Sequence, residues 1–117
     1  MRQKYKPYTG RQGDIILLDF MPNAGSEIGK RRPAVIVSND DFNQHCTVRM
    51  VCPITSTVNQ FPLHVVLDQR TKIQGSVLCE QMKSLDVGRR NVQFLETIPQ
   101  DLLDEIIDIL LGSLEKV

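Results

Sequence analysis

The sequence predicts a single domain of mainly β structure that ends in one α-helix, with the strands forming a small barrel. Six short apolar segments, each bounded by Gly, Pro, Asn, Asp or Ser, follow one another between residues 14 and 94. The last fifth changes to the three- and four-residue apolar spacing of an amphipathic helix. A chain of 117 residues, 41% of them hydrophobic, is about the size of one domain with one core.

The predicted elements follow one another in a simple order. Residues 1–10 are basic and polar, and we expect them to form a flexible tail before a domain that spans residues 11–117. Pro and Gly residues fall singly between the apolar segments, so no linker divides the domain. We expect strands at 14–20, 34–38, 47–54, 64–67, 76–82 and 92–94.

The final segment predicts a helix that begins near residue 98. Thr97 and Gln100 have the spacing of a capping box, and a proline such as Pro99 is tolerated in the first turn of a helix. The apolar face is wider than one stripe, which fits either a helix that covers one core or one that also contacts a second subunit. Its apolar residues are Leu102, Leu103, Ile106, Ile107, Ile109, Leu110, Leu111 and Leu114.

Composition limits the classes of function. The 14 basic and 14 acidic residues cancel, but cations predominate before residue 33 and acids after residue 95, which permits a local cationic surface. The three cysteines never form a C-x-x-C pair, which indicates neither a disulfide framework nor a zinc site. Without a signal-like start or an apolar stretch of about 20 residues, we expect a reduced, cytoplasmic protein that does not associate with membranes.

The segment from residue 25 to residue 33 is the predicted active-site loop. It places two glycines, one acid and three cations (GSEIGKRRP) between two strand-like segments that are nearly chargeless. Strands at both ends would hold such a loop on rigid supports. The pattern is typical of an anion-binding cleft.

Several motifs resemble one known family. The chain resembles the MazF/PemK toxins, sequence-selective endoribonucleases of bacterial type II toxin–antitoxin systems. The resemblance follows the family's order and covers nearly the whole chain beyond residue 10. It rests on GDI at 13–15, GSE at 25–27 with Gly29, RPAVIV at 32–37, CPITS at 52–56 and CEQMKSLD at 79–86.

This resemblance implies an SH3-like or plasmid-maintenance-toxin barrel that forms a homodimer. It further implies that single-stranded RNA, such as mRNA, binds in grooves at the subunit interface and that a cognate antitoxin protein occupies the same grooves. Contact with DNA is then expected only through the antitoxin complex. Neither a cofactor nor a metal is expected.

The chemistry of metal-free RNA cleavage assigns roles to three residues. Cleavage by the neighbouring 2′-hydroxyl requires removal of one proton, stabilisation of a crowded phosphorane and protonation of the 5′-oxygen that leaves. Arg32 suits the second task because its planar guanidinium can bond two phosphate oxygens, whereas its permanent charge makes it a poor proton acceptor. Glu27 is the predicted proton acceptor, and the hydroxyl of Thr55 is expected to stabilise charge. Family members with this pattern use the matching Arg and Thr in catalysis.

Five further residues are expected to bind the substrate: Ser26, Gly29, Ser56, Glu80 and Gln81. Hydroxyls donate to phosphate oxygens, and an acceptor beside an amide can read base edges in single-stranded RNA. The two histidines, the residues most often used for proton transfer near neutral pH, are interpreted differently. His45 is expected in a polar turn and His64 on the outer face of a strand.

Two other functions stay open at this stage. The same barrel serves gyrase-binding toxins of the CcdB type, which need no nuclease site, although the pairing of Arg32 with Thr55 argues against them. The other alternative is a catalytically inactive relative that binds RNA or an antitoxin.

Overall fold

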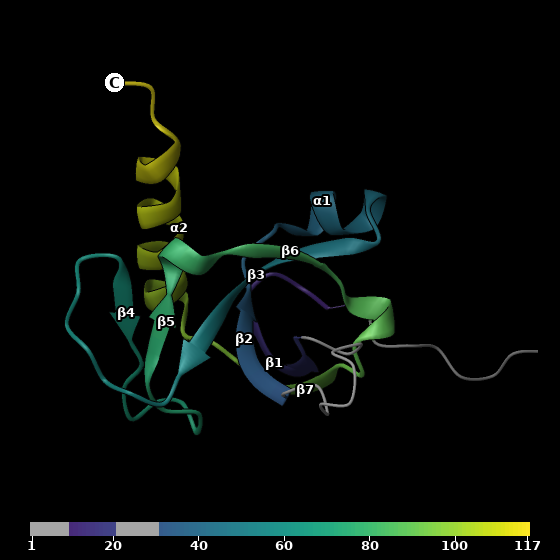
Figure 1. Ribbon diagram of the computed structural model, residues 1–117, viewed down its shortest axis with the longest axis horizontal. Coiled ribbons are helices and arrows are strands. Elements are labelled where there is room, and N and C mark those ends of the chain that lie inside the picture. Colours follow the sequence, from purple (N-terminus) through teal and green to yellow (C-terminus); the bar gives the residue numbers. More distant parts are fainter. Residues whose placement is uncertain (1–9, 21–30) are drawn as a thin grey trace, which may run out of the picture.

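The computed structural model describes residues 10–20 and 31–117 (Figure 1). This part of the chain forms one seven-stranded antiparallel sheet with a helix at its C-terminal end, which confirms the predicted fold class. The strands are β1 Asp14–Asp19, β2 Arg31–Ile36, β3 Val48–Thr55, β4 His64–Val66, β5 Ser76–Leu78, β6 Lys83–Asp86 and β7 Gln93–Thr97. The helices are α1 Asp40–His45 and α2 Gln100–Leu114, and the 3₁₀ turns are η1 Cys79–Gln81 and η2 Val87–Arg89.

Strand β3 is the centre of the sheet. The strands lie in the order β4-β5-β3-β2-β1-β7, and β6 also pairs with β3. One edge of β3 pairs with β2, while the other pairs with β6 over 48–51 and with β5 over 54–55. Residues from β2, β5, η1 and β6 are therefore brought together around one strand.

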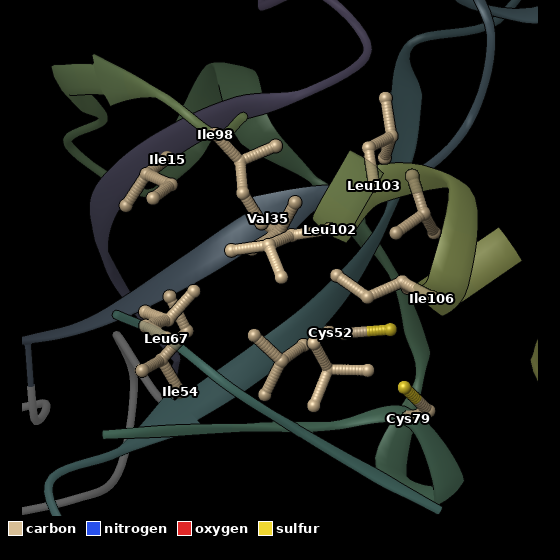
Figure 2. Packing of buried hydrophobic residues seen from close by; sticks show 13 residues of the cluster. Ile15, Val35, Cys52, Ile54, Leu67, Cys79, Ile98, Leu102, Leu103 and Ile106 are labelled. Atoms are coloured by element: carbon tan, nitrogen blue, oxygen red, sulfur yellow. The ribbon is translucent and has the colours of Figure 1, made fainter. Parts of the chain in front are cut away.

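One face of the sheet is covered by α2. Figure 2 shows Leu102, Leu103 and Ile106 of the helix directed at Val35 and Cys52 of the sheet. Each of these five residues is at most 8% exposed. Because apolar side chains on α2 recur every three or four residues, a single helix face can cover the strands. Burial of this face against the sheet is the main support for the helix.

Two buried thiols lie in this same core. Figure 2 shows the sulfur atoms of Cys52 and Cys79 directed toward one another, and Cys52 is completely buried. A hydrogen bond with Cys79, together with burial, raises the pKa of Cys52 far above its usual range. All three cysteines of the chain are free, and Cys46 is exposed. At neutral pH the buried Cys52 is therefore an uncharged thiol that packs as a small apolar side chain.

A second core lies on the opposite face of β1, β2 and β3. It consists of Ile16, Leu18, Ala34, Ile36, Val51, Leu85 and Val87, with Phe20 and Val92 packed against it. Alternate residues along a strand point to opposite faces, so each of the three strands contributes to both cores. This second core ends near Phe20, which is where the candidate site lies.

The structure corrects two predicted strands. Strand β2 begins at Arg31 rather than at residue 34, because Arg31 and Arg32 already pair with β1. The predicted strand at 76–82 is wrong, since it ends at Leu78 and is followed by η1 and by a separate strand, β6. The two pieces pair with different parts of β3, and η1 carries the chain from one pairing to the other.

The short helix α1 was not predicted. Its first turn is capped by Asn39, whose Oδ1 accepts a hydrogen bond of 2.8 Å from the amide of Phe42. Asp40 and Asp41 follow in the first turn, where acids complement the positive end of the helix dipole. His45 lies in the last turn of this helix and not in a polar loop.

The start of α2 also differs from the prediction. The helix begins at Gln100, and its N-cap residue is Pro99, which provides no side-chain hydrogen bond. The predicted capping box is wrong. Thr97 belongs to β7, and the side-chain Nε2 of Gln100 donates to Oδ1 of Asp104, at 2.8 Å. The C-terminal turns extend beyond the sheet (Figure 1), and Leu111 and Leu114 are 59% and 79% exposed.

Residues 1–9 of the predicted N-terminal tail lie outside the described residues. Gly10, the last residue assigned to the tail, is buried. Of the helices in residues 10–20 and 31–117, none has both the length and the apolar character needed to cross a membrane.

Candidate functional site

A cleft of about 390 Å³ opens where the second core ends. It is lined by Phe20, Arg32, Pro53, Ile54, Thr55, Leu78, Gln81 and Lys83. These residues come from five elements, β2, β3, β5, η1 and β6, and from the residue that follows β1. Among the residues that the structure describes, the lining includes two cations, Arg32 and Lys83, and no carboxylate, which favours an anionic ligand.

The sheet register brings Arg32 and Thr55 together. Ala34 on β2 pairs with Pro53 on β3, and the same register continued by two residues places Arg32 opposite Thr55. Because side chains alternate between the two faces, both residues lie on the face of the second core. Two of the predicted catalytic residues, which are 23 positions apart in the sequence, thus line one cleft.

Arg32 is exposed at the beginning of β2, opposite Leu18 on β1. Within the described ranges, no hydrogen bond or ion pair of its guanidinium is found, so its donors are available to a ligand. The neighbouring Arg31 is different. Its Nη1 donates to the carbonyl of Asn91 at 2.8 Å and pairs with Asp19 at 3.3 Å. The adjacent arginines therefore have separate roles, one toward the cleft and one within the protein.

Thr55 is held at the end of β3 by a close approach of β5. Its Oγ1 accepts a hydrogen bond of 3.4 Å from the amide of Thr57, which leaves the hydroxyl proton free to be donated. Gly75, just before β5, has φ +128°, and a Cβ atom there would lie 1.9 Å from the carbonyl oxygen of Thr55. Only glycine permits this approach.

Gln81 and Lys83 form the opposite side of the cleft. Gln81 is the last residue of η1, and Lys83 opens β6, where it pairs with Val51 on β3. The turn at η1 therefore places the side-chain amide of Gln81 in the same cleft as the Arg32 guanidinium. Lys83 adds a second positive charge to this cleft.

Glu80 faces a different neighbour. Its Oε2 lies 3.0 Å from Nε2 of His64 on β4, and it does not line the cleft. The side chain of His64 is only 8% exposed and its ring packs edge-on against Phe61, at 4.9 Å between ring centroids. The prediction of an outward-facing His64 is wrong, because the contacts with Glu80 and Phe61 enclose the ring.

The other predicted site residues fall elsewhere. Glu27, Ser26 and Gly29 lie outside the described residues. Ser56 is exposed just beyond the end of β3, next to Thr55. The structure thus brings together Arg32, Thr55 and Gln81 and places Glu80 on a neighbouring surface.

The predicted set of site residues omitted Phe20 and Lys83. Both follow the two-residue period of buried positions, Phe20 after Ile16 and Leu18, and Lys83 before Leu85. The two-residue alternation therefore already placed both side chains on the same face as these buried residues. That this face carries the cleft could be recognised only from the structure.

No group of three or more His, Cys, Asp or Glu side chains in residues 10–20 and 31–117 is arranged to hold a metal ion. Among the described residues, Arg32 and Lys83 are the charged groups that line the cleft.

Comparison with known proteins finds close relatives. Endoribonuclease MazF of Staphylococcus epidermidis is 35% identical over 109 residues, which cover 87% of this chain and 91% of the relative. Endoribonuclease MazF of Staphylococcus saprophyticus is 33% identical over the same shares of the two chains.

Solved structures show the same fold. MazF from Deinococcus radiodurans superposes with a TM-score of 0.79 at 35% identity, covering 92% of this chain and 97% of that one. A structure of MazE–MazF from the same organism gives 0.80 at 34% identity, covering 92% and 96%. Residues 11–114 match the family described as PemK-like, MazF-like toxin of type II toxin–antitoxin system. With this match over most of its length, the chain belongs to the PemK-like and MazF-like toxin family.

Proposed function

We propose that this chain is the toxin of a type II toxin–antitoxin system and acts as a metal-independent, sequence-specific endoribonuclease. It cleaves single-stranded RNA to 2′,3′-cyclic phosphate and 5′-hydroxyl ends and so inhibits translation in the cytoplasm. One observation carries the proposal. Arg32 and Thr55, opposite one another when the register of β2 and β3 is continued, line one cleft with Lys83. Membership of the family and the names of the two staphylococcal relatives support the same activity.

The reaction begins when the 2′-hydroxyl attacks the adjacent phosphorus. Negative charge then accumulates on the non-bridging oxygens of the phosphorane. The Arg32 guanidinium offers two parallel donors to these oxygens and has no protein partner to give up among the described residues. Donors that are already in place when charge develops lower the barrier most effectively.

Thr55 and Lys83 assist from the neighbouring strands. The Thr55 hydroxyl donates a hydrogen bond to a phosphate oxygen and keeps its proton, while its oxygen accepts a hydrogen bond from the amide of Thr57. Lys83 provides a point charge for the phosphate group. Glu27 is our proposed acceptor of the 2′-hydroxyl proton, on the basis of its carboxylate and its place in the loop that precedes Arg32.

The cleft also contains groups suited to a nucleobase. The amide of Gln81 can donate to and accept from a base edge, and the ring of Phe20 offers a surface for stacking. Base edges are open to such contacts in single strands, which favours an unpaired RNA substrate. Gly29 and the hydroxyls of Ser26 and Ser56 are proposed to contact the RNA backbone, and Glu80 acts through its neighbour in η1, Gln81.

Two protein partners are proposed. The solved MazE–MazF structure supports a cognate antitoxin as the first partner. We propose that this antitoxin covers the RNA-binding cleft and that DNA is contacted only through the complex. The exposed Leu111 and Leu114 at the end of α2 support a homodimer, since a second subunit would cover them.

The test is RNA cleavage by the purified protein in EDTA, followed by mapping of the ends. We expect cyclic phosphate on the upstream fragment, a 5′-hydroxyl on the downstream fragment, and cuts confined to one short sequence. The Arg32→Ala variant provides the negative control. Intact RNA together with inhibition of DNA gyrase would move the assignment to a gyrase-binding toxin. Intact RNA that nevertheless binds would indicate an inactive relative.

A further inference from the structure

Two arginines join the ends of β1 and β2 to the segment that precedes β7. Nη1 of Arg90 donates to the carbonyl of Asp19 at 3.2 Å and to that of Phe20 at 2.5 Å. The Arg90 carbonyl in turn accepts from the amide of Asp19 at 2.8 Å. From the other side, Nη1 of Arg31 donates to the carbonyl of Asn91 at 2.8 Å and to Oδ1 of Asp19 at 3.3 Å. We call this set, Asp19, Arg31, Arg90 and Asn91, the arginine clamp.

The backbone around η2 is shaped to present the clamp. The side chain of Asp86 accepts from the amide of Gly88 at 3.0 Å, and the amide of Arg90 donates to Val87 at 3.4 Å. Asn91 then has φ 54°, a left-handed conformation in which asparagine is the commonest residue after glycine. This reversal places the Asn91 carbonyl within reach of Arg31.

The clamp lies one residue away from the cleft on each strand. The ladder between β1 and β2 ends with the pair Asp19 and Arg31, and the preceding pair contains Arg32. Phe20 follows the last pair of the described ladder, and its carbonyl accepts a hydrogen bond from Arg90. Phe20 and Arg32 line the cleft, whereas Arg31, Arg90 and Asp19 do not.

We infer that Arg90 and Arg31 are positioning residues that hold Phe20 and Arg32 in the geometry required for RNA cleavage. The inference rests on the proposed function, because its readout is the cleavage rate. Arginine suits the role, since one rigid guanidinium can reach two carbonyls at fixed angles and keeps its charge at any physiological pH. Reaction rates depend steeply on such geometry, and a displacement of about 1 Å at a reacting group can cost about 100-fold.

The kinetic test compares Arg90→Ala with Arg90→Lys and with Arg89→Ala. Arg89 is the matched control, because it is the adjacent exposed arginine of η2 and its side chain makes no hydrogen bond or ion pair with the described residues. For Arg90→Ala we expect kcat to fall by about 10- to 100-fold with KM for RNA within about threefold. Arg90→Lys should recover part of kcat, and Arg89→Ala should stay within about twofold. All assays are run well below the unfolding midpoint of each variant.

A spectroscopic test is independent of activity. The chain contains four phenylalanines, and labelling with 4-fluorophenylalanine gives a fluorine signal for each, with Phe20 assigned by its loss in Phe20→Leu. We expect Arg90→Ala to shift or broaden the Phe20 signal and Arg89→Ala to leave it unchanged.

The outcomes separate this inference from the proposed function. If Arg90→Ala raises KM and weakens the salt dependence of binding while kcat holds, Arg90 contacts the RNA directly and the inference is overturned. An unchanged kcat with an unchanged Phe20 signal also overturns it. If the parent protein does not cut RNA, the proposed function fails, and the fluorine shift alone then decides whether Arg90 positions Phe20.

Discussion

The two faces of the central strands differ in how their hydrophobic cores end: one is covered by a helix, and the other ends in a cleft. On one face, Cys52 and Ile54 of β3 belong to a core that α2 helps to close, with Cys52 near Ile106 of the helix and Ile54 beside Leu67. On the other face, Val51 is buried, but the same row of β3 continues through Pro53 to Thr55 in an open cleft. Both rows come from one strand, because alternate side chains point to opposite faces.

This difference separates stability from activity. The helix-covered face is a filled core, in which any missing atom leaves a cavity. The cleft face replaces its last apolar positions with Arg32, Thr55 and Lys83, whose polar groups remain available to a ligand. We therefore expect mutations on the first face to change unfolding and mutations on the second to change catalysis.

The largest effect is expected from Ile106→Ala on the helix-covered face. Ile106 is completely buried, so truncation should lower the free energy of unfolding by about 2–5 kcal/mol. Urea unfolding followed by circular dichroism measures this loss. The graded control Ile106→Val should cost about 0.5–1.5 kcal/mol. Equal losses for both variants would show that the helix does not close a well-packed core.

On the cleft face, Arg32→Ala should lower kcat by about 100- to 1,000-fold, the range found when one donor to a developing oxyanion is removed. The unfolding free energy should change by less than about 0.5 kcal/mol, because Arg32 is exposed. Single-turnover cleavage of an RNA containing the recognition sequence gives the rate. Arg32→Lys retains the positive charge but lacks the paired donors of the guanidinium. Its activity, compared with that of Arg32→Ala, separates the effect of charge from the effect of two-point hydrogen bonding. Cleavage by Arg32→Ala at the parental rate would show that the site is misplaced.

Gly75→Ala should affect both properties, because Gly75 joins the ends of β3 and β5. Its Cβ atom would overlap the Thr55 carbonyl oxygen in a backbone conformation that alanine rarely adopts. We expect a loss of about 1–3 kcal/mol in stability and a fall in kcat as Thr55 moves. The matched control is Gly112→Ala in α2, where no atom lies within 4 Å of the new Cβ and the helix should gain up to about 1 kcal/mol. A Gly75→Ala variant with parental stability and rate would show that this approach is not required.

The smallest effect concerns Arg70, which links a surface loop to the start of α2. Its guanidinium bonds Asp68 at 2.8 Å and Asp101 at 2.9 Å, and these hydrogen bonds lower the pKa of both carboxyls below the ordinary 3.8. A lowered carboxyl pKa contributes stability above its unfolded value, and the contribution is lost as pH falls through the folded value. Arg70→Ala should therefore lower the melting temperature slightly at pH 7. The difference should shrink as pH falls below 3.8 and vanish once pH is below the lowered pKa of both carboxyls. Because Arg70 and its two carboxylate partners are exposed, 1 M salt should also reduce the difference in melting temperature. A difference that persists in strong acid would assign the effect to packing.

Much of the fold could be predicted because its signals are local. The two-residue alternation around Ile15 and Ile16 and the helical spacing from Leu102 to Ile106 each report which side of an element is buried. Where several partners compete for one strand, local signals fail. The apolar run at 76–82 reads as one strand, yet it divides at η1 because its two halves pair with different parts of β3.

By itself, the sequence determined a mainly β domain with a terminal helix and predicted Arg32, Thr55 and Gln81 as groups that bind RNA. Residue types carry that chemistry, and periodicity carries the element types. Only the tertiary structure decided that these three residues share a cleft with Phe20 and Lys83, that Glu80 turns toward His64, and that Arg31 and Arg90 hold the strand ends. The reason is physical: those relations depend on strand register and on contacts between segments far apart in the chain, which no local pattern encodes.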